Sequence, residues 1–123
     1  MSLLLDTHIV LWWLADDPTL AEEIKDRLDQ EVDVYVSSAT IWEVSIKQAL
    51  GKLDPPDLPE QIINSGFRLL NITAEHAMAA GRLPMHHRDP FDRMLIAQAQ
   101  LEGLTLVTRD AHVQKYDVDV LPA

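Results

Sequence analysis

Short apolar runs and stretches with helical periodicity alternate along the whole chain. The first run covers residues 3–5, and a second segment, residues 32–36, places valine at every other position. Such segments, when turn residues bound them, predict buried strands. The predicted strands cover residues 3–5, 32–36, 67–72, 104–107 and 118–121.

Helix signals fill the segments between these strands. Asp17-Pro18 and Asp89-Pro90 each predict an N-cap followed by a proline in the first helical turn, and Gly51 and Gly103 each predict a helix end. Apolar residues at helical spacing then give the helices one buried face. The predicted helices, caps included, cover residues 9–14, 17–28, 39–50, 60–64, 73–80 and 89–103.

This alternation predicts an α/β fold, with one domain over residues 1–123 and a mostly parallel central sheet flanked by helices. In such sheets ligands bind outside the carboxyl ends of the strands, near the point where the strand order reverses. Asp6 and Asp110 each follow a predicted strand closely. We therefore expect a site at that edge of the sheet.

Composition narrows the classes of function. The formal net charge of -10 argues against a generic nucleic-acid binder, whose surface is normally basic. No cysteine is present, so oxygen or imidazole groups would have to hold a metal. Residues 1–5 are too short and uncharged for a signal peptide, and no apolar run is long enough to span a membrane. We expect a cytoplasmic protein.

Basic residues nevertheless lie close in sequence to the acidic residues of interest. They are Arg82, His86, His87, Arg88, Arg93 and Arg109. Bound divalent cations would also invert the local charge. An acidic protein of this kind is thus still compatible with a nucleic-acid substrate.

Four carboxylates stand near predicted strand ends or helix starts. They are Asp6, Glu43, Asp92 and Asp110. Taken singly, Asp6 and Asp110 could be helix caps and Asp92 a first-turn acid favoured by the helix dipole. Brought to one edge of a small sheet, the four would repel one another unless divalent cations neutralised them. The cluster therefore predicts a Mg²⁺ or Mn²⁺ site of the kind that hydrolyses phosphodiesters.

Glu43 has the most specific competing interpretation. It lies three residues after Thr40, which is the spacing of a capping box. If the helix instead begins at Ser37 or Ser38, Glu43 falls in the second turn and cannot cap. A carboxylate on an otherwise apolar helix then needs a partner such as a cation.

Four segments together carry a family resemblance. They are LLDTH at residues 4–8, SSATIWE at 37–43, DPFDRMLIAQA at 89–99 and LVTRD at 106–110. In this order and spacing the chain closely resembles PIN-domain nucleases, and most of all the VapC-like toxins of bacterial toxin–antitoxin pairs. The resemblance spans nearly the whole chain.

The resemblance implies a PIN-like nuclease domain with assigned site residues. The residues that match the family's metal-binding acids are Asp6, Glu43, Asp92 and, at a more variable position, Asp110. Thr7 and Thr108 match hydroxyl residues that support the site. Implied with them are Mg²⁺ or Mn²⁺ as cofactor, RNA as substrate, a cognate antitoxin as partner and assembly as a homodimer.

We therefore expect an endoribonuclease toxin in which water attacks phosphorus in line and leaves 5′-phosphate and 3′-hydroxyl ends. Two alternatives stay open. One is a PIN fold without activity that serves as an interaction module. The other is a phosphoryl-transfer α/β domain phosphorylated on Asp6, although no acid lies two residues from Asp6 and no matching lysine motif is evident.

Several neighbouring residues have less specific expectations. Asp89 is expected to cap its helix. Solvated or structural roles are expected for the histidines near the acids, namely His8, His86 and His87. The tryptophans are expected in the core or at a subunit interface, and they are Trp12, Trp13 and Trp42.

Overall fold

The computed structural model describes residues 2–31 and 33–123. Met1 and Val32, the latter predicted to begin a strand, lie outside the described residues. Among the described helices, none combines the length and the apolar composition that crossing a membrane requires.

Five strands form the central sheet, in the order β3-β2-β1-β4-β5. They are β1 (Leu3–Leu5), β2 (Val34–Ser37), β3 (Arg68–Leu70), β4 (Thr105–Thr108) and β5 (Val120–Pro122). All neighbouring strands pair in parallel, so the predicted α/β fold with a mostly parallel sheet is confirmed. The strand predicted at 67–72 is shorter in the structure, where β3 is an edge strand with one neighbour.

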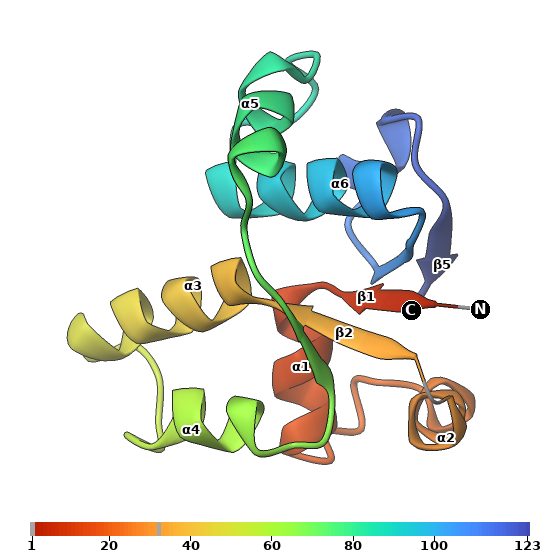
Figure 1. The fold of residues 1–123 in the computed structure, drawn as a ribbon. Helices are drawn as coiled ribbons and strands as arrows, with labels where there is room; N and C mark the ends of the chain where they lie inside the picture. The colour runs from red at the N-terminus through yellow and green to blue at the C-terminus, as the bar shows by residue number, and fades with distance from the viewer. Residues whose placement is uncertain (1, 32) are drawn as a thin grey trace.

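Helices cover both faces of this sheet. They are α1 (Thr7–Leu14), α2 (Glu22–Gln30), α3 (Ser38–Ala49), α4 (Leu58–Ile63), α5 (Ala74–Arg82) and α6 (Pro90–Glu102), with a short 3₁₀ helix, η1 (Val113–Lys115), before β5. Figure 1 shows α5 and α6 on one side of the sheet and α1, α2 and α4 on the other.

The first strand connects two hydrophobic cores. Leu3 and Leu5 pack with residues of α1, α2 and α4, whereas Leu4 between them packs with Leu95 and Ile96 of α6. This alternation follows from the pleat, which points successive side chains to opposite faces. Because β1 is buried on both faces, its sequence is a continuous apolar run.

Two of the predicted helix ends are confirmed by their hydrogen bonds. The Asp89 carboxylate accepts the backbone N–H groups of Phe91 and Asp92, at 2.8 and 3.1 Å, and so caps α6. After α3, Gly51 adopts a φ of 72°. Its N–H donates to the Gln48 carbonyl, which is part of the glycine-dependent ending that helices commonly use.

The helix start predicted at Asp17-Pro18 is wrong. Helix α2 begins at Glu22, and its N-cap, Ala21, offers no side-chain hydrogen bond. The Asp17 carboxylate instead accepts the Thr19 N–H at 2.8 Å. An aspartate closes a turn with the amide two residues ahead as readily as it caps a helix, so the local signal does not discriminate between the two.

The helix predicted at 60–64 begins slightly earlier in the structure. Helix α4 starts at Leu58, and Pro59 lies in its first turn, where a missing N–H costs nothing. Of the two places expected for the tryptophans, the core or a subunit interface, Trp42 is not in the core, because its side chain is 60% exposed. Trp12 and Trp13 are partly buried and pack against the core that contains Leu3 and Leu5, as predicted.

Candidate metal centre at the carboxyl edge of the sheet

The candidate site lies where the strand order reverses. Strands β2 and β3 lie to one side of β1, and β4 and β5 lie to the other, so the chain leaves the carboxyl ends of β1 and β4 in diverging directions. A cleft of about 300 Å³ opens there. Its lining residues are Asp6, His8, Ile9, Trp12, Asp92, Arg109 and Asp110. This is the place where parallel α/β sheets bind ligands.

Asp6 caps a helix and faces this cleft with the same carboxylate. Its Oδ1 accepts the His8 N–H at 3.3 Å, which caps α1. Its Oδ2 accepts the Thr108 hydroxyl at 2.6 Å, from the end of the neighbouring strand. The Thr108 hydroxyl in turn accepts the Asp110 N–H at 3.1 Å. Thr108 thus holds Asp6 and the Asp110 backbone together.

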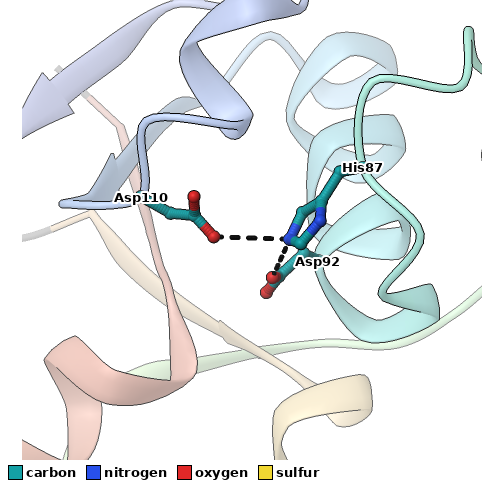
Figure 2. Close-up of side chains that lie close together, drawn as sticks. All are labelled: His87, Asp92 and Asp110. Carbon is teal, nitrogen blue, oxygen red and sulfur yellow. Dashed lines mark hydrogen bonds and ion pairs between the residues drawn. The ribbon is translucent and has the colours of Figure 1, made fainter.

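Asp92, Asp110 and His87 form the tightest group. The His87 Nε2 atom lies 2.6 Å from Asp92 Oδ2 and 3.3 Å from Asp110 Oδ2. One ligand-type atom from each of the three lies within 4.8 Å of the others, a spacing that a metal ion could bridge. Figure 2 shows the imidazole between the two carboxylates, which come from the first turn of α6 and from the segment after β4.

The role of Asp89 explains why Asp92 is available to this group. Asp89 already accepts the first free N–H groups of α6, including that of Asp92. The Asp92 side chain is therefore not needed as a cap. Its carboxylate turns to His87 instead.

Glu43 lies outside the group of His87, Asp92 and Asp110. Helix α3 begins with Ser37 as its N-cap, whose hydroxyl accepts the Ala39 N–H at 3.0 Å, so Glu43 falls in the second turn and does not cap. The buried Glu43 carboxylate accepts the Thr7 hydroxyl at 2.8 Å and pairs with Lys47 at 3.1 Å. It is linked to Asp6 through the adjacent residue Thr7.

The loop before α6 positions His87. The buried Arg93 guanidinium donates to four backbone carbonyls, those of Ala80, Leu83, Pro84 and His87. The Tyr116 hydroxyl accepts the N–H groups of His86 and His87 and donates to the Pro84 carbonyl. The backbone of His87 is thus held from two directions.

A solvated or structural role was expected for His87, and the structure places its imidazole between the carboxylates of Asp92 and Asp110. The only sequence signal for this contact is proximity, because His87 precedes Asp92 by five residues. Arg93, noted as a basic residue beside the acids, is buried and directed to the loop rather than to the cleft. Arg109 does line the cleft, above the Trp12 ring at 4.6 Å.

Electrostatics couple the carboxylates of the site. Burial raises the pKa of Asp92 to about 6, the charge of Asp6 acts in the same direction, and the hydrogen bond with His87 opposes both. For Asp110, burial alone would raise the pKa, but hydrogen bonds from the His112 N–H and ring, with the charges of His87 and His112, lower it overall.

The donor set fits a divalent cation. It consists of carboxylate oxygens with one imidazole nitrogen, which suits Mg²⁺, Mn²⁺ and the later divalent metals of the first transition row. Burial, with the charge of Asp6 adding to it, raises the pKa of Asp92, and a bound cation would favour the charged carboxylate.

Comparisons with known proteins agree with this geometry. The family model described as PIN domain matches residues 3–119. The chain is 28% identical over 119 residues to Ribonuclease VapC22 of Mycobacterium tuberculosis, covering 94% of this chain and 92% of that relative.

Solved structures show the same fold. A chain of the DNA-bound VapBC complex from Salmonella typhimurium superposes with a TM-score of 0.77 at 19% identity, covering 99% of this chain and 98% of that chain. A chain of FitAcB from Neisseria gonorrhoeae superposes with a TM-score of 0.72 at 26% identity, covering 97% and 96%. Because the family match extends from β1 almost to the C-terminus and includes every element that forms the acidic cleft, this chain belongs to the PIN domain family.

Proposed function

We propose that this protein is a metal-dependent endoribonuclease and the toxin of a toxin–antitoxin pair. The observation that carries the proposal is the convergence of Asp6, Asp92 and Asp110 on one cleft at the switch point of the sheet. Its likeness to Ribonuclease VapC22, over nearly the full length of both chains, supports RNA as the substrate.

In this proposal a small set of residues holds Mg²⁺ or Mn²⁺. The acids are Asp6, Glu43, Asp92 and Asp110. Thr108 orients Asp6 through its 2.6 Å hydrogen bond, and Thr7 orients Glu43 through its 2.8 Å bond. Cations bound by these acids would supply Lewis-acid activation and neutralise charge on the phosphate.

The reaction is hydrolysis of a phosphodiester. A water oxygen forms a bond to phosphorus, the bond from phosphorus to the 3′ oxygen breaks, and the 3′ oxygen takes a proton. Within this chain, the acids orient the reacting groups, and the cleft admits a backbone phosphate beside Arg109. The cationic Arg109 offsets part of the negative field that the net charge of -10 creates.

We propose that the antitoxin reaches this cleft along a neighbouring groove. A groove of about 480 Å³ between α1 and α4 shares His8 and Trp12 with the cleft. Leucines of both helices, among them Leu11 and Leu58, give it apolar contact area. An antitoxin segment there could place an arginine among the carboxylates. Its charge would pair with the same acids that hold the cation, and this pairing would inhibit the enzyme.

We also propose a homodimer through the face that carries Trp42. Trp42 packs edge-on against Phe91 at 5.0 Å yet stays 60% exposed. Beside it lies an apolar pocket of about 210 Å³, lined in part by Ile72 and Met94. An exposed apolar surface of this kind is typical of subunit interfaces.

The direct test is RNA cleavage by the purified protein with Mg²⁺, with Mn²⁺ and with EDTA. We expect cleavage only with a divalent cation, and none from Asp6→Asn in any buffer. Cleavage that persists in EDTA contradicts the metal mechanism. A protein that binds its antitoxin but cleaves no RNA is instead the inactive interaction module.

A further inference from the structure

We infer that His87 is a nitrogen ligand of the metal centre and that it makes the site prefer Mn²⁺ over Mg²⁺. This inference rests on the proposed metal-dependent function and adds a ligand outside the acidic residues. It concerns the composition of the site, and it is testable by metal binding without any RNA.

The first argument is the position of the imidazole. Nε2 points at Asp92 Oδ2 and Asp110 Oδ2, with distances of 2.6 and 3.3 Å. In an octahedral shell with bonds of roughly 2.1 Å, neighbouring ligand atoms lie about 3 Å apart. The two nitrogen–oxygen distances lie on either side of this value before any ion is bound, and all three atoms lie within 4.8 Å of one another. Figure 2 shows the imidazole between the two carboxylates.

The second argument is the support that holds the residue. The His87 N–H donates to the Tyr116 hydroxyl at 2.9 Å, and the His87 carbonyl accepts from Arg93 at 3.2 Å. On its ring face, His87 stacks with His112, with centroids 5.1 Å apart. Backbone and ring are therefore held before a cation arrives, as preorganised metal ligands are.

The preference for Mn²⁺ follows from ligand chemistry. Mg²⁺ binds oxygen ligands and retains water, whereas imidazole suits the divalent metals of the first transition row. Substituting one imidazole nitrogen into a carboxylate site therefore adds more affinity for Mn²⁺ than for Mg²⁺. A site built from the acids alone would lack this discrimination.

A competing role predicts the opposite effect. If His87 were a positively charged placeholder between Asp92 and Asp110, a metal ion would have to displace it. Removing the imidazole would then leave Mn²⁺ binding unchanged or tighter. The sign of the change in Mn²⁺ affinity separates the two roles.

The test measures Mn²⁺ and Mg²⁺ binding by calorimetry for the unsubstituted protein, His87→Gln and His86→Gln. The control, His86→Gln, alters the adjacent residue of the same loop. We expect His87→Gln to weaken Mn²⁺ binding by at least about tenfold, with a smaller change for Mg²⁺, and the control to keep both affinities.

Pulsed paramagnetic resonance of bound Mn²⁺ supplies a second readout, which detects the ligand nitrogen directly. With ¹⁵N-histidine incorporated, the unsubstituted protein should show coupling between Mn²⁺ and nitrogen, and the coupling should disappear in His87→Gln but persist in His86→Gln. Mn²⁺ that binds and supports cleavage without nitrogen coupling overturns the role of His87 and leaves the nuclease standing. Unchanged or tighter Mn²⁺ binding by His87→Gln overturns it as well.

Discussion

At the scale of single residues, Asp6 shows that one carboxylate can both cap a helix and face the candidate site. One oxygen accepts the His8 N–H that begins α1, and the other accepts the Thr108 hydroxyl at the cleft. Asp92 differs, because Asp89 satisfies the start of α6 and leaves Asp92 free to face His87. Substituting asparagine for these aspartates can therefore distinguish a structural role, measured by folding, from a chemical role, measured by cleavage.

Charge-removing substitutions should abolish cleavage while the protein stays folded. Asp6→Asn retains the capping oxygen, and Asp92→Asn removes no cap, so both should melt as cooperatively as the unsubstituted protein. Their RNA cleavage rate should fall by about a hundredfold or more, as loss of a metal ligand would cause. Asp89→Asn, which keeps the cap of α6, is the matched control and should retain most of the activity. Full cleavage by either site variant would show that these acids are structural.

The pKa of Asp92 predicts how stability depends on pH without metal. Its folded-state pKa of about 6 lies above the ordinary 3.8, so between these values the folded state binds more protons. The free energy of unfolding therefore falls as pH rises through that window. In EDTA above pH 6, Asp92→Asn should have a higher Tm than the unsubstituted protein, and the difference should vanish as the pH approaches 3.8. Thermal melts across this range check it, and a lower Tm for the variant above pH 6 would contradict a cost of ionising the buried Asp92 carboxyl.

At the scale of elements, the loop between α5 and α6 positions His87 beside the carboxylates at the sheet edge. Arg93, from the second turn of α6, donates back to carbonyls of α5 and the loop, including Ala80 and His87. Tyr116 holds the same loop from just beyond η1. The loop is therefore ordered by hydrogen bonds to two buried side chains.

Removing the Tyr116 hydroxyl should weaken this loop without touching a carboxylate. Tyr116→Phe leaves the N–H groups of His86 and His87 and the Pro84 carbonyl without this partner. The free energy of unfolding should fall by about 1–3 kcal/mol, because three part-buried hydrogen bonds lose this partner. Denaturant melts measure this, with Tyr35→Phe as the matched control. Equal stability of both variants would show that the hydroxyl does not order the loop.

At the scale of the whole molecule, two surfaces flank the strand-order reversal. The acidic cleft opens between the carboxyl ends of β1 and β4, next to the groove that borders α1 and α4. The apolar face with Trp42 joins α3 to the start of α6. These are the two separate surfaces that we propose for the antitoxin and for a second copy of the chain.

The apolar face predicts the oligomeric state. Because the Trp42 side chain is 60% exposed, Trp42→Ser should change the free energy of unfolding by only about 0.5 kcal/mol in the isolated chain. Light scattering should give a dimer for the unsubstituted protein and a monomer for the variant. Leu101→Ser, an exposed apolar substitution outside this face, should remain dimeric. A Trp42→Ser dimer would place the interface elsewhere.

Local signals were sufficient for much of the fold. The apolar run of β1, the Asp89-Pro90 start of α6 and the glycine after α3 each act through neighbours in sequence, so they could be predicted. Asp17 was misassigned because an aspartate can cap a helix or close a turn through equally local hydrogen bonds, and here it accepts the Thr19 N–H. His87 was missed because its position depends on Tyr116, 29 residues away in sequence.

The sequence by itself determined the succession of strands and helices along the chain and the burial of β1, because periodicity and capping are short-range effects. The candidate acids followed from their places near predicted strand ends and helix starts, together with the family resemblance. Only the tertiary structure decided which acids meet. Asp6 and Thr108 are 102 residues apart yet share a 2.6 Å hydrogen bond, since β1 pairs with β4 across the switch point. The same packing joins His87 to Asp92 and Asp110, while it directs Glu43 to Thr7 and Lys47. These contacts arise from strand order and loop closure, which no local pattern encodes.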